Sequence, residues 1–242
     1  MGLAPRNARV HALRALARDR QLRRESAEVL IEGATLIAEA ASAGWTILEE
    51  FHSSAGKPVV LSEAVVLSDA ALERIATTEH PQPNIATATR SQATPLNSCS
   101  TLLVLDRIAD PGNLGTLVRS AEAAGIDAVV VTPGSTDPFS PKVIRSSAGA
   151  IFHQSIIECE LAELRIERFR LVGTSSHRGE HYRECDWSGK VAIVLGNEAH
   201  GLDDDAPIDT WVQIPHGGRS ESLNVAMAGT LVAFALAESR SA

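Results

Sequence analysis

The sequence predicts an α/β protein in which a mostly parallel sheet follows a smaller α/β domain. Short, almost wholly apolar runs in the second half of the chain, such as TLLVLD (101–106) and VAIVLG (191–196), alternate with helical segments. Such runs are typical of strands buried on both faces of a sheet. A segment rich in Ser, Thr and Pro, SQATPLNSCS (91–100), indicates a linker before this region. We therefore expect one domain at 1–95 and a second at 100–242.

Before the linker, the pattern indicates a small α/β unit. Its expected elements are a helix at about 8–20, the apolar run VLIEG (29–33), a helix at 34–43, the segments TILEEFH (46–52) and KPVVLS (57–62), a helix at 68–78 and an extended segment at 84–89. Gly44 is expected to end the second of these helices, because glycine readily adopts the left-handed backbone that closes many helices.

After the linker, strands and helices alternate. The expected elements are a strand at 101–106, a helix at 113–125, a strand at 128–132, a helix at 141–149, a helix near 160–168, strands at 170–175, 191–196 and 211–215, and a helix from about 222 to 239. Parallel sheets of this kind hold ligands at the carboxyl ends of their strands, so we expect the functional site there.

The charge of the chain is unevenly distributed. The 242 residues carry a formal net charge of −8, yet residues 1–24 hold seven arginines and a single acid, Asp19. A basic segment of this kind suits contact with phosphate groups. The same segment carries an apolar stripe at Val10, Leu13 and Leu16, so an amphipathic helix whose arginines are merely solvated is the alternative.

Several function classes are disfavoured. The three cysteines are scattered, which fits a reducing, cytoplasmic compartment without disulfides. The N-terminus has no signal-like apolar region, and the longest apolar run, at 225–237, is shorter than the roughly 20 residues of a membrane span. We therefore expect no membrane partner. We find no Gly-x-Gly-x-x-Gly pattern and no P-loop. The histidines lack metal-binding spacing, so we also expect no metal.

Polar, glycine-containing loops follow two of the predicted strands. In DRIADPGNLGTLVRSAEAAG (106–125), Asn113 is expected to cap a helix, and Arg119 lies six residues further on. In VLGNEAHGL, a buried strand ends at Gly196, where backbone can approach a ligand closely, and Glu198 follows. Taken alone, each loop also fits an ordinary turn with a solvated charge.

A third loop, HGGRSESLNVAMAG (216–229), follows another strand and runs into an apolar helix. Asn224 sits between Leu223 and Val225, so we expect it to be buried and therefore to need hydrogen-bond partners. Because the carboxyl ends of parallel strands meet at one edge of the sheet, we expect the three loops to converge there.

Together, DPGNLGTLVRSAEAAG, VLGNEAHGL and IPHGGRSESLNVAMAG resemble the three signature motifs of the SpoU (TrmH-like) RNA ribose 2′-O-methyltransferases of the SPOUT superfamily. The resemblance covers residues 101–240, and SPKVIRSSAGAIF (140–152) is similar to the segment that the family carries between its first two motifs. The N-terminal half, with VLIEGATLIAEAASAG, is similar to the small RNA-gripping domain of many members.

The resemblance implies a reaction and an assembly. The expected reaction transfers a methyl group from S-adenosylmethionine to a ribose 2′-hydroxyl in RNA. Ribosomal RNA is preferred as the substrate, and transfer RNA and a role in antibiotic resistance stay open. A C-terminal trefoil knot is expected to form the cofactor pocket, in exception to the usual rule against knots. The active site is expected at the interface of a homodimer.

The resemblance also implies roles for individual residues. Arg119 is expected at the reacting hydroxyl, where it would bind the neighbouring phosphate and stabilise the developing oxyanion, because a guanidinium does not lose its proton near neutral pH. Glu198 is expected to order the loops by accepting hydrogen bonds. The other polar positions of the catalytic set are Asn113, Ser222 and Asn224.

Two further sets of residues are expected, one for the cofactor and one for RNA. The expected cofactor-binding residues are Thr174, Leu195, Gly196, Asn197, Gly201, Ile214, Pro215, Ser222 and Leu223. The expected RNA-binding residues are Arg6, Arg9, Arg18, Arg20, Arg23, Arg24 and Arg145.

Two other functions remain as alternatives. One is a non-catalytic RNA-binding or ribosome-assembly relative with the same fold, which titration with S-adenosylmethionine would distinguish. The other is an α/β oxidoreductase with a nucleotide cofactor, which the missing glycine pattern disfavours.

Overall fold

The computed structural model describes residues 2–219 and 221–241, and it divides the chain into two compact units. Unit 1 comprises the residues up to Gln92 together with Phe139–Phe152, and unit 2 comprises the residues from Ala93 to Pro138 and from His153 onward. The 139–152 segment lies in the range assigned from the sequence to the second domain. The division into compact units therefore differs from a division of the chain at one linker, 91–100, because unit 1 also includes Phe139–Phe152.

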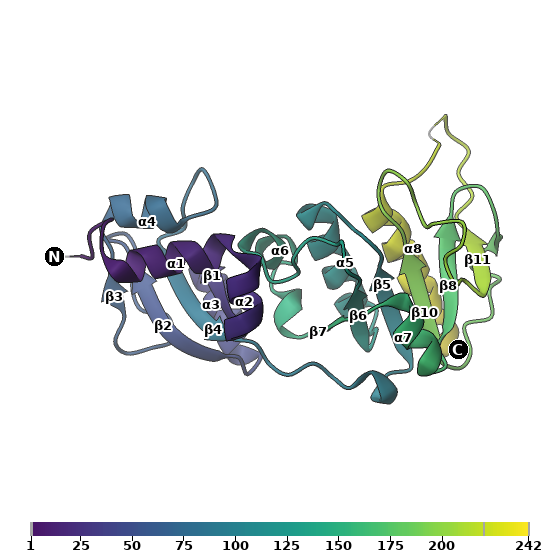
Figure 1. Cartoon of the computed structure of the whole chain (residues 1–242), viewed down its shortest axis with the longest axis horizontal. Coiled ribbons are helices and arrows are strands. Elements are labelled where there is room, and N and C mark those ends of the chain that lie inside the picture. Colours follow the sequence, from purple (N-terminus) through teal and green to yellow (C-terminus); the bar gives the residue numbers. More distant parts are fainter. Residues whose placement is uncertain (1, 220, 242) are drawn as a thin grey trace. The chain divides into compact units, whose positions relative to one another are not determined.

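Unit 1 is built on a four-stranded sheet with the strand order β1-β4-β2-β3 within the described residues (Figure 1). Strand β4 is antiparallel to both of its neighbours, and β3 is parallel to β2. The strands are β1 (Glu28–Glu32), β2 (Thr46–His52), β3 (Val65–Val66) and β4 (Asn84–Thr89). The helices are α1 (Ala8–Arg18), α2 (Arg20–Ser26), α3 (Ala34–Ser42), α4 (Asp69–Ile75) and α6 (Pro141–Ser146).

The basic N-terminal segment forms two helices where the sequence predicted one. Asp19 has an extended backbone at φ −99° and ψ 109°, and its carboxylate accepts a hydrogen bond from the Leu22 N–H, so it ends α1 and caps α2. The apolar stripe packs into the core of unit 1, where Leu13 and Leu16 are almost fully buried beside Phe51. One face of α1 is therefore structural, as the amphipathic alternative requires.

Unit 2 contains a seven-stranded sheet within the described residues, in the order β7-β6-β5-β10-β8-β11-β9. Every pairing between these strands is parallel, which confirms the predicted fold class. The strands are β5 (Thr101–Leu105), β6 (Ala128–Val131), β7 (Ser155–Glu158), β8 (Arg170–Ser175), β9 (Glu180–His181), β10 (Val191–Leu195) and β11 (Thr210–Gln213). The two edge strands, β7 and β9, are absent from the sequence-based prediction.

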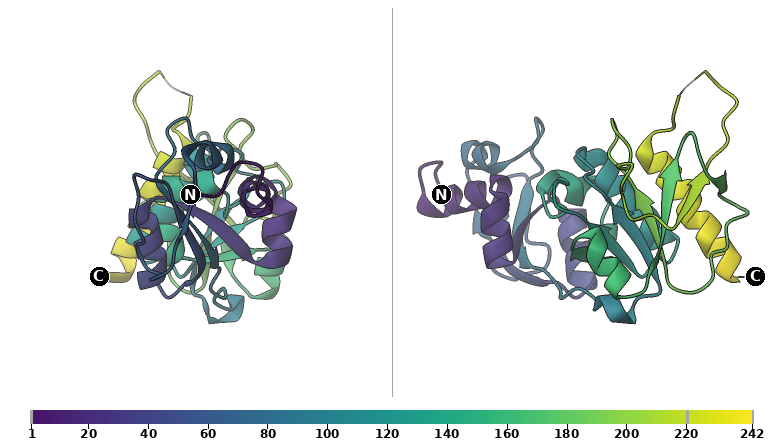
Figure 2. Two further views of the ribbon diagram at one scale, coloured as in Figure 1. Left: turned by 90° about the vertical axis from the view of Figure 1, so that its left-hand side faces the viewer. Right: turned by 45° about the vertical axis from the view of Figure 1, so that its right-hand side comes forward.

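The three loops that carry the signature motifs, at 106–125, 194–202 and 216–229, are called the motif loops below. The helices of unit 2 position two of them. They are α5 (Pro111–Ala123), α7 (Leu161–Ile166) and α8 (Val225–Ser241). Helix α8 packs on α5 and on β10, and the right-hand view of Figure 2 shows it running alongside the strands. Gly229 permits this packing, because a Cβ there would lie 2.4 Å from side-chain atoms of Leu117 and Leu195. No helix in the described ranges is both long enough and apolar enough to span a bilayer.

Candidate active site

A cavity of about 740 Å³ lies beside the carboxyl ends of β8, β10 and β11 in unit 2. Its walls come from the segments 174–178, 196–202 and 221–225, together with parts of β11 and α8. The predicted convergence of the strand-end loops is therefore confirmed. The volume falls within the range of about 300–1,000 Å³ that is usual for small-molecule sites.

Most of the residues predicted to bind a cofactor line this cavity. Those that do are Thr174, Gly196, Asn197, Gly201, Ile214, Ser222 and Leu223. Two predicted residues do not. Leu195 is fully buried, and its side chain packs against Gly229 of α8. Pro215 lies between two lining residues without lining the cavity itself.

The loop after β10 is closed on itself. The Asn197 N–H donates to the Gly201 carbonyl at 3.1 Å, and the Gly201 N–H donates back to the Asn197 carbonyl at 2.8 Å. A Cβ on Gly196 would lie 2.3 Å from the Gly201 carbonyl carbon, so only glycine fits at position 196. The loop thus presents backbone directly to the cavity.

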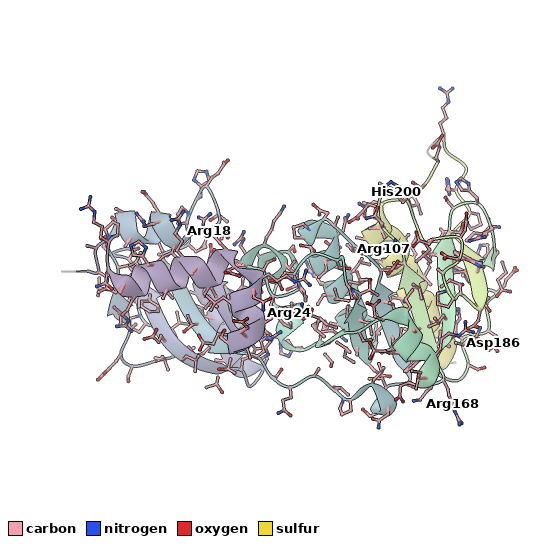
Figure 3. The ribbon with its side chains drawn as sticks, in the orientation of Figure 1. Arg18, Arg24, Arg107, Arg168, Asp186 and His200 are labelled. Carbon is pink, nitrogen blue, oxygen red and sulfur yellow. The ribbon has the colours of Figure 1, made fainter. Side chains whose placement is uncertain are left out.

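Arg107 ties this closed loop to the end of β5. Its carbonyl accepts a hydrogen bond from Asn197 Nδ2 at 2.8 Å, and its guanidinium pairs with Asp203 at 2.7 Å and with Asp106 at 3.1 Å. His200 contacts the same asparagine through its Nδ1 at 3.2 Å from Oδ1. Figure 3 labels Arg107 and His200 in this part of unit 2.

Three hydrogen-bonded side chains join the three motif loops. One Glu198 oxygen accepts from the Asp110 N–H and from Asn113 Nδ2, both at 3.0 Å, and the other accepts from the Ala109 N–H at 3.1 Å. Asn113 Oδ1 in turn accepts from Asn224 Nδ2 at 3.1 Å. The loop-ordering contacts expected of Glu198 are therefore confirmed.

The hydrogen bonds also favour the charged form of Glu198. Partial burial opposes ionisation, but the donors at Asn113, Ala109 and Asp110 outweigh it and lower the pKa of Glu198 below its usual value. The group that links the first two loops is therefore a carboxylate at neutral pH.

Two local predictions around this chain of contacts are wrong. Asn113 does not cap α5: the cap is Asp110, whose carboxylate accepts from the Asn113 N–H at 2.9 Å, and Pro111 occupies the first helical position. Asn224 is exposed where burial was expected. Its Oδ1 accepts from the N–H groups of Ala226 and Met227, so it caps α8 and leaves its Nδ2 to reach Asn113.

Arg119 does not line the cavity of its own chain. It lies on the exposed side of α5, two turns from the start of the helix. It makes no hydrogen bond or ion pair with any part of the chain that the structure describes. A charged group left without an intramolecular partner is available to a ligand or to another chain.

Residues that sequence reasoning missed also line the cavity. The most prominent are Arg178 and Trp211, where the guanidinium carbon lies 3.7 Å from the centre of the indole ring. His177, His200 and His216 line it as well. No group of three or more His, Cys, Asp or Glu side chains among the described residues is arranged to hold a metal ion.

Two of the arginines predicted to bind RNA are engaged inside unit 1. Arg23 is only 4% exposed and donates to the Leu16 carbonyl. Arg145 pairs with the buried Glu32 at 3.3 Å and donates to Thr77 Oγ1 at 2.8 Å. Arg23 is therefore corrected to a structural role, because it offers almost no surface to a ligand. The Arg145 side chain is 24% exposed, so its contact with RNA stays a prediction.

The other predicted arginines lie nearer the surface. Arg9 is exposed and pairs with Glu49 above the ring of Phe51, and Arg18, labelled in Figure 3, donates to the Ala76 carbonyl at 3.3 Å. Arg6 and Arg24 are exposed, and Arg20 is partly exposed. A hollow of about 520 Å³ lies where α1 meets α2, lined by His11, Arg14, Ala15, Arg18, Asp19, Arg20 and Gln21.

Comparison with protein families gives two matches. Residues 100–234 match the model of the SpoU rRNA methylase family, and residues 7–86 match the MRM3-like substrate binding domain. Among curated proteins, the 23S rRNA (guanosine(2553)-2′-O)-methyltransferase RlmP of Bacillus subtilis is 34% identical over 217 residues, which cover 86% of this chain and 87% of that protein.

Solved structures give the same relationship over the whole chain. The AdoMet-bound rRNA methyltransferase from Sinorhizobium meliloti superposes with a TM-score of 0.84 at 27% identity and covers 98% of this chain and 96% of its own. The SpoU methyltransferase AviRb from Streptomyces viridochromogenes, in complex with AdoMet, superposes with a TM-score of 0.87 at 25% identity and covers 98% and 99%.

Proposed function

The chain belongs to the SpoU rRNA methylase family, and from that membership we propose that it methylates a ribose 2′-hydroxyl of ribosomal RNA. It is an S-adenosylmethionine-dependent RNA 2′-O-methyltransferase. The observation that supports this most directly is the convergence of three motif loops on one cavity of about 740 Å³. Ribosomal RNA is the proposed substrate because the RlmP relative is named for it over most of both chains.

The cavity fits S-adenosylmethionine in size and in chemistry. Ile214, Leu223 and Val225 offer apolar walls to a purine, and the closed loop at Gly196 offers backbone groups at close range. When bound, the cofactor supplies an electrophilic methyl group on a sulfonium. We assign the holding of the adenosine to these residues together with Thr174 and Asn197.

We propose that the hydrogen bonds joining Glu198, Asn113 and Asn224 hold the three loops in fixed positions relative to one another. Each side chain bridges two segments that are far apart in sequence, so the loss of one contact loosens two loops. Alignment of reacting groups can supply roughly 7–11 kcal/mol of a barrier. Ser222 lines the same cavity as Asn224 and is assigned to the same part of the site.

We propose that a second copy of the chain completes the site. Met227, Leu231 and Phe234 form an apolar stripe on α8 and are 65%, 42% and 40% exposed. Exposed stripes of this kind commonly mark protein interfaces. Helix α8 packs on α5, where Ser120 bonds to Thr230 at 2.6 Å, so the stripe adjoins the helix that carries Arg119. The proposed dimer places Arg119 of one copy at the cavity of the other.

In this arrangement Arg119 acts as a fixed positive charge. A guanidinium keeps its proton near neutral pH, so Arg119 does not serve as a general base. It binds the phosphate next to the target ribose and stabilises the negative charge that develops on the 2′-oxygen. The trefoil knot expected for the family is part of the same proposal.

We propose that unit 1 binds the RNA, in the cytoplasm, through arginines that are exposed or partly exposed. The proposed contacts are Arg6, Arg9, Arg18, Arg20 and Arg24. Each phosphate contact releases counterions, so affinity should fall with salt. Replacing Arg6, Arg20 and Arg24 together by glutamine should flatten the slope of log affinity against log salt, whereas Arg168→Gln in unit 2 should not. An unchanged slope in the triple variant would remove RNA contact from this segment.

The experiment that tests the proposed substrate is a map of 2′-O-methyl groups in total RNA from cells with and without the gene. The expected result is the loss of one ribosomal 2′-O-methyl group when the gene is deleted. Loss of a methyl group from a transfer RNA would contradict the ribosomal assignment, and an unchanged map would contradict the proposed substrate class.

A further inference from the structure

Arg178 and Trp211 form a stacked pair on the wall of the cavity. Arg178 lies in the loop between β8 and β9, and its guanidinium carbon is 3.7 Å from the centre of the Trp211 ring. Both side chains line the cavity, and neither belongs to the three motif loops. A cation over an indole face is held in place by electrostatic attraction.

The backbone holds this loop against β11. Gly179 has a φ of +114°, and a Cβ there would lie 2.4 Å from the Trp211 carbonyl oxygen. Any larger residue at 179 would push the loop away from the strand, so the glycine keeps the neighbouring Arg178 over the ring. A side chain fixed in this way loses little conformational entropy when it binds a ligand.

The charges around the cavity make Arg178 distinctive. It is the one Arg or Lys among the cavity-lining residues that the structure describes, whereas Glu198, Asp204 and Glu221 line the cavity as acids. Its nearest acidic partner, Asp204, is 3.8 Å away and has a fully exposed side chain. This distance is too long for a hydrogen bond, so a ligand carboxylate can replace Asp204 without breaking a strong contact.

We infer that Arg178, supported by Trp211, binds the carboxylate of the methionine moiety of S-adenosylmethionine. The inference rests on the proposed function, and it names the residue that distinguishes an amino-acid-bearing nucleoside from one without a carboxylate. A planar guanidinium can donate two parallel hydrogen bonds to a carboxylate, which a lysine cannot. Arg178 is a cofactor-positioning residue in this role and does not touch the methyl group.

The test compares two ligands that differ only in this carboxylate, S-adenosylmethionine and its decarboxylated form. Isothermal titration gives the dissociation constant of each for the wild-type chain, Arg178→Gln and Arg178→Lys. We expect Arg178→Gln to weaken S-adenosylmethionine binding by about tenfold, because a hydrogen bond between charged groups is lost at a partly exposed position. Binding of the decarboxylated ligand should not change, and Arg178→Lys should fall between the two.

Arg183 supplies a matched control. It also stacks on a neighbouring aromatic ring, at 5.6 Å from Tyr182, but it does not line the cavity. Arg183→Gln should leave both dissociation constants unchanged. Tryptophan emission gives a second readout, because Trp45 and Trp187 are buried whereas Trp211 is partly exposed on the cavity wall.

Two results would overturn the inference alone and leave the proposed function standing. If Arg178→Gln weakens both ligands equally, Arg178 supports the loop and does not recognise the carboxylate. If it weakens neither, Arg178 does not contact the cofactor. A wild-type chain that binds neither ligand would overturn the proposed function and this inference with it, so the two failures are distinguishable.

Discussion

Replacing Glu198 by alanine removes the acceptor that holds the start of α5 to the loop after β10. Three donors lose their partner: the N–H groups of Ala109 and Asp110 and the amide of Asn113. A buried hydrogen bond to a charged group contributes about 1.5–3 kcal/mol. Glu198 is exposed, so water can replace part of each bond, and roughly 0.5 kcal/mol for each of the three is a fairer value.

The sum of about 1.5 kcal/mol corresponds to a roughly tenfold weaker dissociation constant for S-adenosylmethionine, if the bound state requires the ordered loops. Isothermal titration measures this directly, and thermal unfolding of the free protein shows whether the fold is intact. Glu221→Ala is the control, because Glu221 is a carboxylate on the same cavity wall and has no hydrogen bond to the described residues. Equal effects of the two variants would mean that charge, and not loop order, explains the loss.

Three other outcomes are expected. Arg119→Ala should lower the methyl-transfer rate by at least about a hundredfold, as the loss of an oxyanion-stabilising group does, and leave the dissociation constant of the cofactor unchanged; equal loss of both would assign Arg119 to cofactor binding. Leu231→Glu should shift the chain from dimer to monomer in sedimentation, since it places a charge in the proposed interface, and an unchanged dimer would exclude the α8 stripe. The lowered pKa of Glu198 means that its stabilising contribution is complete above the usual value of about 4.3 and is lost as the pH falls through its lower folded value. The contribution of Glu198 to cofactor affinity should therefore stay constant from neutral pH down to about pH 5. A loss of affinity already at pH 6 in the wild-type chain, absent from Glu198→Gln, would contradict this.

The parallel sheet could be predicted because its central strands are buried on both faces. In β5 and β10 every residue is buried, so the sequence reads as uninterrupted apolar runs. The edge strands lack this signal: β7 is at most partly buried and β9 has two residues. The packing of 139–152 into unit 1 depends on contacts between distant segments, such as Arg145 with Glu32, which no local pattern specifies.

The site was partly predictable for a similar reason. Loops at strand ends are visible in the sequence, and topology alone brings Gly196, Ile214 and Leu223 to one cavity. The Asp110 cap was missed because an Asp-Pro pair before a helix competes with the later asparagine for the same role. Arg178 and Trp211 are far apart in the sequence, and the pairing of β11 with β8 and β9 brings them together.

The most direct measurement mixes two inactive variants of the chain and assays methyl transfer. Arg119→Ala removes the guanidinium, and Gly196→Val destroys the cofactor loop, since a Cβ at 196 collides with Gly201. If Arg119 serves the cavity of the partner, a mixed dimer contains one intact site, and a random mixture should recover about a quarter of wild-type activity. If Arg119 serves its own cavity, the mixture contains no intact site, and no recovery above the separate variants would contradict the shared site.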